Sequence, residues 1–446
     1  MNFKQIDKWS FRYAVTKFYV RFIHNFIFYR NICVTGTENL PKDVPLFFAP
    51  NHQNALMDAL IVLCSVKAQP VFIARADIFK NPLLARILVS MKILPAYRIR
   101  DGKDNLKKNE EIFDVSVRIL ENKKILALFP EATHTDQKHL RVLKKGVQRI
   151  VFQAEEKNNF KLGVKVVPIG IYYSNYWNFK SDIQINFGKP IDIHEYLEIY
   201  KENPQKAMLA LRDKISDELK PLIIHIKNME YYDLYEFMRE FYNKKMRKKL
   251  GLKKSQANKF SADQKIIDLL DSVHDENPEL IEKLKQRAEP YQKILKKLNI
   301  RNWVVEKDEA LTGLIIKSIG LVLSIPVFLY GLINNFIPYY LPKPLTSKLE
   351  DRQFTSSINF VFALIFYPIF YIIQFSIVGI FTEIWWIKYV YLISLPFSGV
   401  AAFYIHRWFV KLKAQWKYYF KQSDEIKALF FKTKKVMNSI TNKYVQ

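Results

Sequence analysis

Short apolar runs alternate with amphipathic stretches between residues 31 and 200 of this chain. Turn-forming residues bound the apolar runs, as is typical of buried strands, and the stretches between them place apolar residues at helical spacing. This alternation predicts an α/β domain in which a mixed sheet is flanked by helices. The predicted strands are 32–34, 45–50, 71–74, 93–97, 125–129 and 164–171, and the predicted helices are 57–66, 105–121 and 146–153.

The segment before this domain, residues 1–30, is amphipathic. Its aromatic and aliphatic residues are interleaved with Arg12, Lys17, Arg21 and His24, a pattern too polar to cross a bilayer. We expect a helix that lies in the membrane interface. A helix packed on the core of the domain fits the same pattern equally well.

Beyond residue 200 the pattern changes twice. Residues 201–310 are charged and helical without a recognisable catalytic cluster, and they predict a helical insert or linker with solvated faces. Residues 311–406 are predominantly apolar and predict C-terminal transmembrane helices, followed by a basic tail at 407–446. The apolar stretches are 312–341, 358–380 and 389–405, and tryptophans that fit an aromatic belt are Trp385, Trp386 and Trp408.

Charge and cysteine content narrow the choice of partner. Lys and Arg number 69 against 43 acidic residues, which gives a net charge of +26. Nucleic acid and an anionic membrane surface both fit that charge. The apolar stretches favour the lipid bilayer, and we expect no nucleic-acid partner. Cys33 and Cys64 show neither metal-ligand spacing nor a disulfide framework, and residues 1–10 predict no cleaved signal peptide.

A histidine and a carboxylate follow the buried run 45–50. His52 lies at a predicted strand-to-helix junction, and Asp58 comes early in the next helix. A carboxylate that accepts the second N–H of an imidazole fixes its tautomer and raises its basicity. Residues six apart on a regular helix point about 120° away from each other, so His52 must precede the helix. Asn54 is then the expected N-cap.

Further polar candidates follow other predicted strands. Glu131 comes after the run 124–129 and could bind hydroxyl groups, although a turn-forming or salt-bridged glutamate fits as well. Arg75, Arg98 and Arg100 could bind phosphate bidentately or could be surface charges. Lys144-Lys145-Gly146 could bind an anion at a helix N-terminus or form a solvated face.

The order of these pieces resembles the glycerolipid acyltransferases of the glycerol-3-phosphate and lysophosphatidate type. Asn51-His52 with Asp58, Leu94-Pro95-Ala96-Tyr97-Arg98, Phe129-Pro130-Glu131-Ala132 and Val166-Val167-Pro168-Ile169 follow the order of that family's motifs, over about residues 36–190. The resemblance implies that His52 is the general base and that Asp58 orients it. It also implies that Glu131 and Arg98 bind the acceptor, together with Asn51, Arg75, Arg100, Pro130 and Ala132. No metal or cofactor is implied.

Two departures from the family pattern concern the acceptor. Five residues separate His52 from Asp58 where four are usual, which resembles the yeast-type glycerol-3-phosphate and dihydroxyacetone-phosphate branch, as does Lys103-Asp104-Asn105-Leu106. Ala132 stands where glycine is usual, and His134 stands where arginine is frequent. For His134 and His139 we expect structural or solvent-facing roles.

The resemblance implies a membrane-bound O-acyltransferase of phospholipid synthesis. The acyl donor would be acyl-CoA or acyl carrier protein, and the acceptor would be glycerol 3-phosphate or lysophosphatidate. The alternative is a non-catalytic lipid-binding or membrane-scaffold protein that retains the fold. His52 and Asp58 argue against that alternative, and a basic nucleic-acid binder has no matching motif.

The distribution of charge predicts the topology of an integral protein of the cytoplasmic membrane. A domain that meets a cytoplasmic acyl donor and a lysine-rich tail should both face the cytoplasm. We therefore expect 312–341 to be a re-entrant or interfacial hairpin, and 358–380 with 389–405 to form a two-span hairpin with 382–388 on the far side. Three plain spans are the alternative. The interruptions in the first stretch are Pro326, Gly331, Asn334, Asn335 and Pro338.

Overall fold

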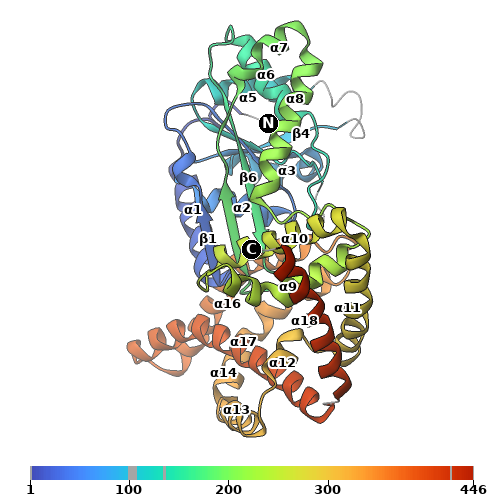
Figure 1. Ribbon diagram of the computed structural model, residues 1–446. Helices are drawn as coiled ribbons and strands as arrows, with labels where there is room; N and C mark the ends of the chain where they lie inside the picture. The colour runs from blue at the N-terminus through green and yellow to red at the C-terminus, as the bar shows by residue number, and fades with distance from the viewer. Residues whose placement is uncertain (1–2, 99–107, 134–136, 422–423, 445–446) are drawn as a thin grey trace. The chain divides into compact units, whose positions relative to one another are not determined.

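A mixed eight-stranded sheet organises the N-terminal part of the chain in the computed structural model, which describes residues 3–98, 108–133, 137–421 and 424–444 (Figure 1). Within these residues the strand order is β1-β7-β6-β2-β5-β3-β4, with β8 paired to β6. All pairs are parallel except β6–β7 and β6–β8. The strands are β1 (Asn31–Thr35), β2 (Leu46–Pro50), β3 (Val71–Arg75), β4 (Ile93–Ala96), β5 (Ile125–Leu128), β6 (Lys165–Tyr173), β7 (Asp182–Phe187) and β8 (Ile191–Asp192).

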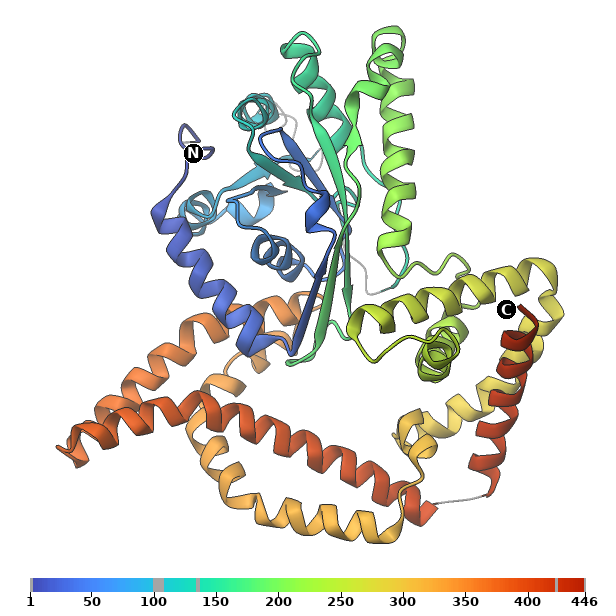
Figure 2. The same cartoon turned by 60° about the vertical axis from the view of Figure 1, so that its left-hand side comes forward.

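The central strands are apolar because both of their faces are covered. Every residue of β2 is buried, and all of β6 after Lys165 is buried as well. Parallel strands covered on both faces read as continuous apolar runs, which is the pattern that the sequence shows. Helices surround the sheet in Figure 2. They are α2 (Leu56–Ser65), α3 (Pro82–Ser90), α5 (Lys108–Glu121), α6 (Gly146–Lys157), α7 (Leu197–Glu202) and α8 (Pro204–Leu219), with short helices η2 (Thr37–Asn39), η3 (Ala76–Phe79), η5 (Ile193–Tyr196) and η6 (Lys220–Leu222).

The mixed sheet flanked by helices confirms the predicted fold class, and each predicted strand is present. The antiparallel strands β7 and β8 were not predicted. The compact unit that contains the sheet comprises residues 1–225 and, from much later in the chain, Leu349–Phe360. It therefore extends past the expected boundary at residue 200.

The N-terminal helix packs through one face only. It consists of α1 (Phe11–Phe22) and a π-helical continuation η1 (Ile23–Phe28). Tyr13 and Val20 are buried, and the Lys17 ammonium donates to the carbonyl oxygens of Val66 and Ala68 at 2.7 and 2.5 Å. Burial lowers the pKa of Lys17 to about 8. The helix is thus fixed to the domain at the C-terminal end of α2.

The second compact unit comprises 226–348 and 361–446 and is helical in its described part. Residues 201–310 were predicted to present solvated faces, but the part of them in this unit also has a buried ion pair. Arg239 and Asp263 lie 2.8 Å apart, and Asn243 bonds to Asp263 as well. The helices outside the apolar stretches are α9 (Tyr232–Lys249), α10 (Gln256–Glu276), α11 (Pro278–Leu298), α12 (Asn302–Lys307), α15 (Lys343–Thr346) and α18 (Asp424–Tyr444).

The apolar stretches are all helical. Two helices are long and apolar enough to cross a membrane, α16 (Phe354–Phe381) and α17 (Trp385–Lys421). The interrupted stretch forms α13 (Leu311–Leu323) and α14 (Ile325–Tyr340), bent by 50° at Ser324, so the pair is either a broken span or a re-entrant segment. The first turns of α16, up to Phe360, belong to the unit that contains the sheet.

Candidate active site

Four parallel strands direct the candidate side chains to one edge of the sheet. β2 pairs with β5, β5 with β3, and β3 with β4. His52 follows β2, Glu131 follows β5, Arg75 ends β3 and Arg98 follows β4. The carboxyl ends of parallel strands meet at the same edge, which is where sites of α/β proteins form.

His52 and Asp58 form a dyad. His52 Nδ1 lies 2.8 Å from Asp58 Oδ2. Asp58 is fully buried in the first turn of α2, whereas the His52 side chain is 17% exposed and reaches solvent. The imidazole stacks on the Phe129 ring, with a centroid separation of 4.4 Å. A carboxylate at Nδ1 favours the tautomer that carries its proton there, which leaves Nε2 with the lone pair that a base would need.

The Asp58 carboxylate is held from several sides. Its Oδ2 also accepts the backbone N–H groups of Gln53 and Asn54, both at 2.7 Å, and its Oδ1 accepts the Tyr173 hydroxyl at 2.8 Å. A carboxylate with this many donors has one orientation, so the imidazole bound to it has one orientation as well.

The predicted position of His52 before the helix is confirmed, but the expected capping role of Asn54 is wrong. The cap position of α2 is Ala55, and the Asn54 side chain donates instead to the Tyr176 carbonyl at 3.1 Å. The reason is the Asp58 carboxylate, which folds the loop back on itself by accepting the two preceding N–H groups. This leaves Ala55 with φ 45° and ψ −124°, a strained conformation for a residue with a Cβ.

Glu131 ties the His52 loop to a second loop. Its Oε1 accepts the backbone N–H of His52 at 2.7 Å, and its Oε2 accepts that of Arg141 at 3.0 Å. The side chain is 2% exposed. Burial raises the pKa of Glu131 to about 7, although the two backbone N–H groups favour the ionised form. The observed contacts brace the loop, and acceptor binding by Glu131 stays a prediction.

Arg75 and Arg98 converge on one carboxylate. Their guanidinium groups lie 3.2 and 3.3 Å from Asp77 Oδ2. Both side chains are partly exposed, at 38% and 27%. Two cations beside a single anion retain a net positive charge, which suits a phosphate, but binding of the acceptor here stays a prediction. Arg100, the motif 103–106 and His134 lie outside the described residues.

The remaining motif residues lie in the framework of the site. Asn51 is 1% exposed, and its amide both donates to and accepts from the backbone of Ile171 on β6, at 3.2 and 2.6 Å. Pro130 is buried, and its carbonyl accepts the Lys144 N–H. Ala132 has φ 59°, a left-handed conformation that glycine adopts at lower cost. This geometry explains why glycine is usual at that position of the resembled family.

Two supporting residues, Tyr173 and Tyr176, were not predicted from the sequence. Tyr173 and Tyr176 are on and just after β6, and their only signal was an apolar strand pattern. The Tyr176 hydroxyl donates to Gln53 Oε1 at 2.9 Å, and its carbonyl accepts Asn54. More than a hundred residues separate these partners. No spacing rule links residues that far apart.

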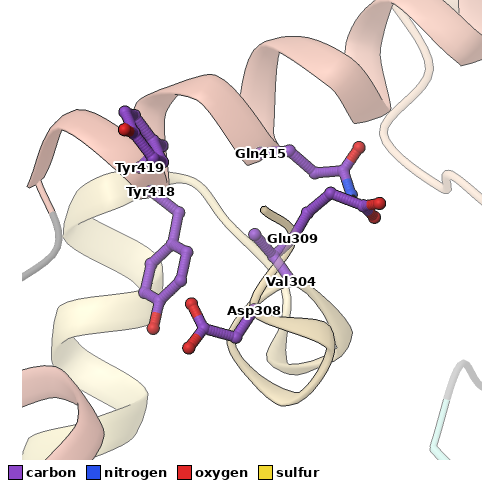
Figure 3. A pocket seen from close by; sticks show the side chains of 6 residues that line it. All are labelled: Val304, Asp308, Glu309, Gln415, Tyr418 and Tyr419. Atoms are coloured by element: carbon purple, nitrogen blue, oxygen red, sulfur yellow. The ribbon is translucent and has the colours of Figure 1, made fainter. Parts of the chain in front are cut away.

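Two hollows of the described structure lie away from His52. One is lined by Phe3, Lys4 and residues of α5. The other, in the helical unit, is drawn in Figure 3, where Asp308 and Glu309 lie across from Gln415 and Tyr418. Within the described ranges, no group of three or more His, Cys, Asp or Glu side chains is placed to hold a metal ion.

A histidine fixed by a buried carboxylate at the carboxyl edge of a sheet is the arrangement of an enzyme that uses a general base. Comparison with known proteins identifies the part of the chain that holds this arrangement. The sequence model of the Acyltransferase family matches residues 31–172, so this part of the chain is an acyltransferase domain.

Two relatives carry glycerolipid names. The chain is 25% identical over 200 residues to a 1-acyl-sn-glycerol-3-phosphate acyltransferase of Borreliella burgdorferi, which covers 43% of this chain and 73% of the relative. It is 28% identical over 124 residues to glycerol-3-phosphate O-acyltransferase 2 of Saccharomyces cerevisiae, which covers 28% of this chain and only 16% of that protein.

A solved structure shows a weaker likeness. The 1-acyl-sn-glycerophosphate acyltransferase of Thermotoga maritima is 19% identical, with a TM-score of 0.35, and the match covers 47% of this chain and 78% of that one. At these values the likeness bears on neither substrate nor mechanism.

Proposed function

We propose that this chain is a membrane-bound O-acyltransferase that moves a fatty acyl group from a thioester donor to a hydroxyl of glycerol 3-phosphate or lysophosphatidate. The observation that carries the proposal is the His52–Asp58 dyad, held at the sheet edge within the acyltransferase domain. The donor is acyl-CoA or acyl carrier protein. No cofactor enters the proposed reaction.

The proposed reaction begins with proton removal. His52 Nε2 takes the proton of the acceptor hydroxyl as its oxygen attacks the thioester carbonyl. Asp58 holds the imidazole and stabilises the imidazolium that forms. The new C–O bond forms, the C–S bond breaks, and the departing thiolate takes the proton back from His52. Each proton and electron pair is then accounted for without a covalent enzyme intermediate.

The acceptor's phosphate is proposed to bind between Arg75 and Arg98. Both guanidinium groups already face the Asp77 carboxylate, and a phosphate offers oxygens in the same geometry with more charge. Glu131 keeps the His52 loop in register with the loop that contains Arg141.

Membrane binding is proposed on two observations. The outer face of α1 and η1 presents Phe11, Phe18, Phe22 and Phe26, with exposures of 69%, 74%, 48% and 71%. Aromatic residues exposed along one helix face are typical of an interfacial helix. The inner face packs on the domain. The core-packing alternative for residues 1–30 therefore describes the inner face, and the interfacial helix describes the outer face. The helices α16 and α17 supply the second observation.

A fluorescent probe tests the interfacial helix. With Cys33 and Cys64 replaced by serine, Phe18→Cys carries an environment-sensitive dye in proteoliposomes, and Leu209→Cys on α8 is the control. Nitroxide-labelled lipids should quench the dye at position 18 and leave the dye at position 209 unchanged. Equal quenching at both positions would refute interfacial binding through this face.

An acceptor panel tests the proposed activity. The purified full chain in liposomes receives acyl-CoA or acylated carrier protein with glycerol 3-phosphate, dihydroxyacetone phosphate or a lysophospholipid. We expect thiol release and an acylated phosphate ester identified by mass spectrometry, both strongly reduced in His52→Ala. A membrane scaffold would release no thiol with any acceptor.

A further inference from the structure

The loop that holds the dyad is supported by a segment from far along the chain. Leu349–Phe360 belongs to the same compact unit as the sheet. Within it Ser356, Ser357 and Phe360 are buried, with exposures of 1%, 5% and 0%. Buried hydroxyl groups are rarely without partners, so the bonds of the two serines indicate what the segment does.

Ser357 bonds to the start of the helix that carries Asp58. Leu56, the first residue of α2, donates its backbone N–H to Ser357 Oγ at 3.2 Å. The cap residue Ala55 has no side-chain oxygen, and among the described contacts its side chain makes no capping bond. First-turn N–H groups need an acceptor from elsewhere when the cap residue supplies none. A serine 301 positions away in the sequence supplies it here.

Ser356 reaches the same loop indirectly, through Tyr176. Its hydroxyl donates to the Tyr176 carbonyl, which also accepts the Asn54 side chain. The Tyr176 hydroxyl in turn donates to Gln53. Gln53 and Asn54 are the residues whose N–H groups hold Asp58 Oδ2. Ser357 therefore contacts the dyad loop directly at Leu56, and Ser356 connects to it through Tyr176 at Gln53 and Asn54.

Phe360 fixes the segment to the domain. Its ring packs edge-on against Phe28 at 5.1 Å and against His24 at 5.9 Å. The strained backbone at Ala55 also requires such support, because a conformation of this kind persists only where its surroundings enforce it. The N–H that follows Ala55 is the one that Ser357 accepts.

We propose that Ser357, assisted by Ser356, is a positioning residue that caps α2 and holds Asp58 and His52 in the geometry for proton removal. Both serines lie in the first turns of α16, and this helix is one of the two that are long and apolar enough to cross a membrane. The expected effect on kcat rests on the proposed acyl transfer. The expected effect on the order of residues 52–58 does not depend on the reaction.

The variants are Ser357→Ala, Ser357→Thr and the control Thr355→Ala, all in the full chain. Thr355 lies in the same turn of α16 and is only half-buried. Loss of a cap typically lowers the equilibrium constant for forming the helix start roughly fivefold. For Ser357→Ala we expect kcat to fall about fivefold, with the acceptor KM unchanged. Ser357→Thr keeps the hydroxyl and should recover most of kcat, and Thr355→Ala should match wild type.

Hydrogen exchange read by mass spectrometry supplies the second measurement. Amides of 53–58 should exchange faster in Ser357→Ala than in wild type, and at the wild-type rate in Thr355→Ala. Unchanged exchange in Ser357→Ala would overturn the inference, and so would an unchanged kcat in an active enzyme. If wild type shows no acyl transfer, the proposed function fails, while the exchange experiment still decides the structural claim.

Discussion

At the scale of single residues, Glu131 connects the chemistry of the site to the stability of the fold. Its carboxylate is buried between two backbone N–H donors, and its pKa is raised to about 7 by burial. The unfolded chain loses this proton near pH 4.5, whereas the folded chain keeps it until about pH 7. The folded state therefore binds more protons between these values, and the contribution of Glu131 to stability falls as pH rises through this window.

Glu131→Gln tests this titration. Glutamine can still accept from His52, but its amide nitrogen faces the Arg141 N–H and loses that bond. The stability advantage of wild type over Glu131→Gln should be larger at pH 4.5 than at pH 7.5, by on the order of 3 kcal/mol for a shift of this size. Thermal unfolding of both proteins in detergent at several pH values measures this stability difference. A difference that stays constant or grows with pH would exclude the raised pKa.

Arg98 is predicted to bind the acceptor's phosphate. Arg98→Ala should raise the acceptor KM far more than the donor KM, and Arg98→Lys should restore binding only in part, because the planar fork is lost. Arg212→Ala is a matched control, since Arg212 on α8 has a similar exposure of 29%. Steady-state kinetics with both substrates varied measure the acceptor KM and the donor KM. Equal changes in both KM values would indicate a folding or general electrostatic effect instead.

At the scale of elements, the strands of the parallel region could be predicted because each is a buried apolar run between turn residues. The antiparallel strand β7 is not a continuous apolar run: Asp182, Gln184 and Asn186 alternate with its apolar residues, a strand pattern that the prediction overlooked. Those polar side chains are satisfied by tertiary partners: Asp182 pairs with Arg30, and Asn186 bonds to Thr35. Spacing along the chain does not reveal such partners.

The bent pair α13 and α14 bears on topology. Close packing joins α14 to α17, since a Cβ added to Gly331 would lie 2.2 Å from the Ser398 carbonyl oxygen. Asn335 donates to the Leu395 carbonyl at 3.3 Å and accepts the Tyr371 hydroxyl at 2.7 Å. Small residues and polar bonds of this kind join helices inside membranes. We therefore favour a re-entrant α13–α14 pair over an interfacial one.

Cysteine labelling tests the two-span topology. With Cys33 and Cys64 replaced by serine, Lys42→Cys reports on the acyltransferase domain, Ser439→Cys on α18, and Glu383→Cys on the connection between α16 and α17. An impermeant reagent added to sealed cells should label only position 383. Three plain spans would place positions 42 and 439 on opposite sides, so labelling one of them from outside would contradict the re-entrant arrangement.

At the scale of the whole molecule, the sequence predicted the His52–Asp58 pair better than the residues that support it. The pair and the positions of the parallel strands along the chain follow from local patterns and motif spacing. Tyr173, Tyr176 and Ser357 could not be found that way, because each contacts the dyad loop from a distant part of the chain. The same limit applies to the boundaries of the sheet-containing unit, to which residues 349–360 return.

We propose His52 as the base of an acyl-transfer site. The most direct measurement is the single-turnover rate of acyl transfer to the preferred acceptor, for wild type and His52→Ala in the same liposomes. We predict a loss of roughly 10² to 10⁴ in rate, with membrane association and thermal unfolding unchanged. Retention of more than about a tenth of the wild-type rate would contradict the claim.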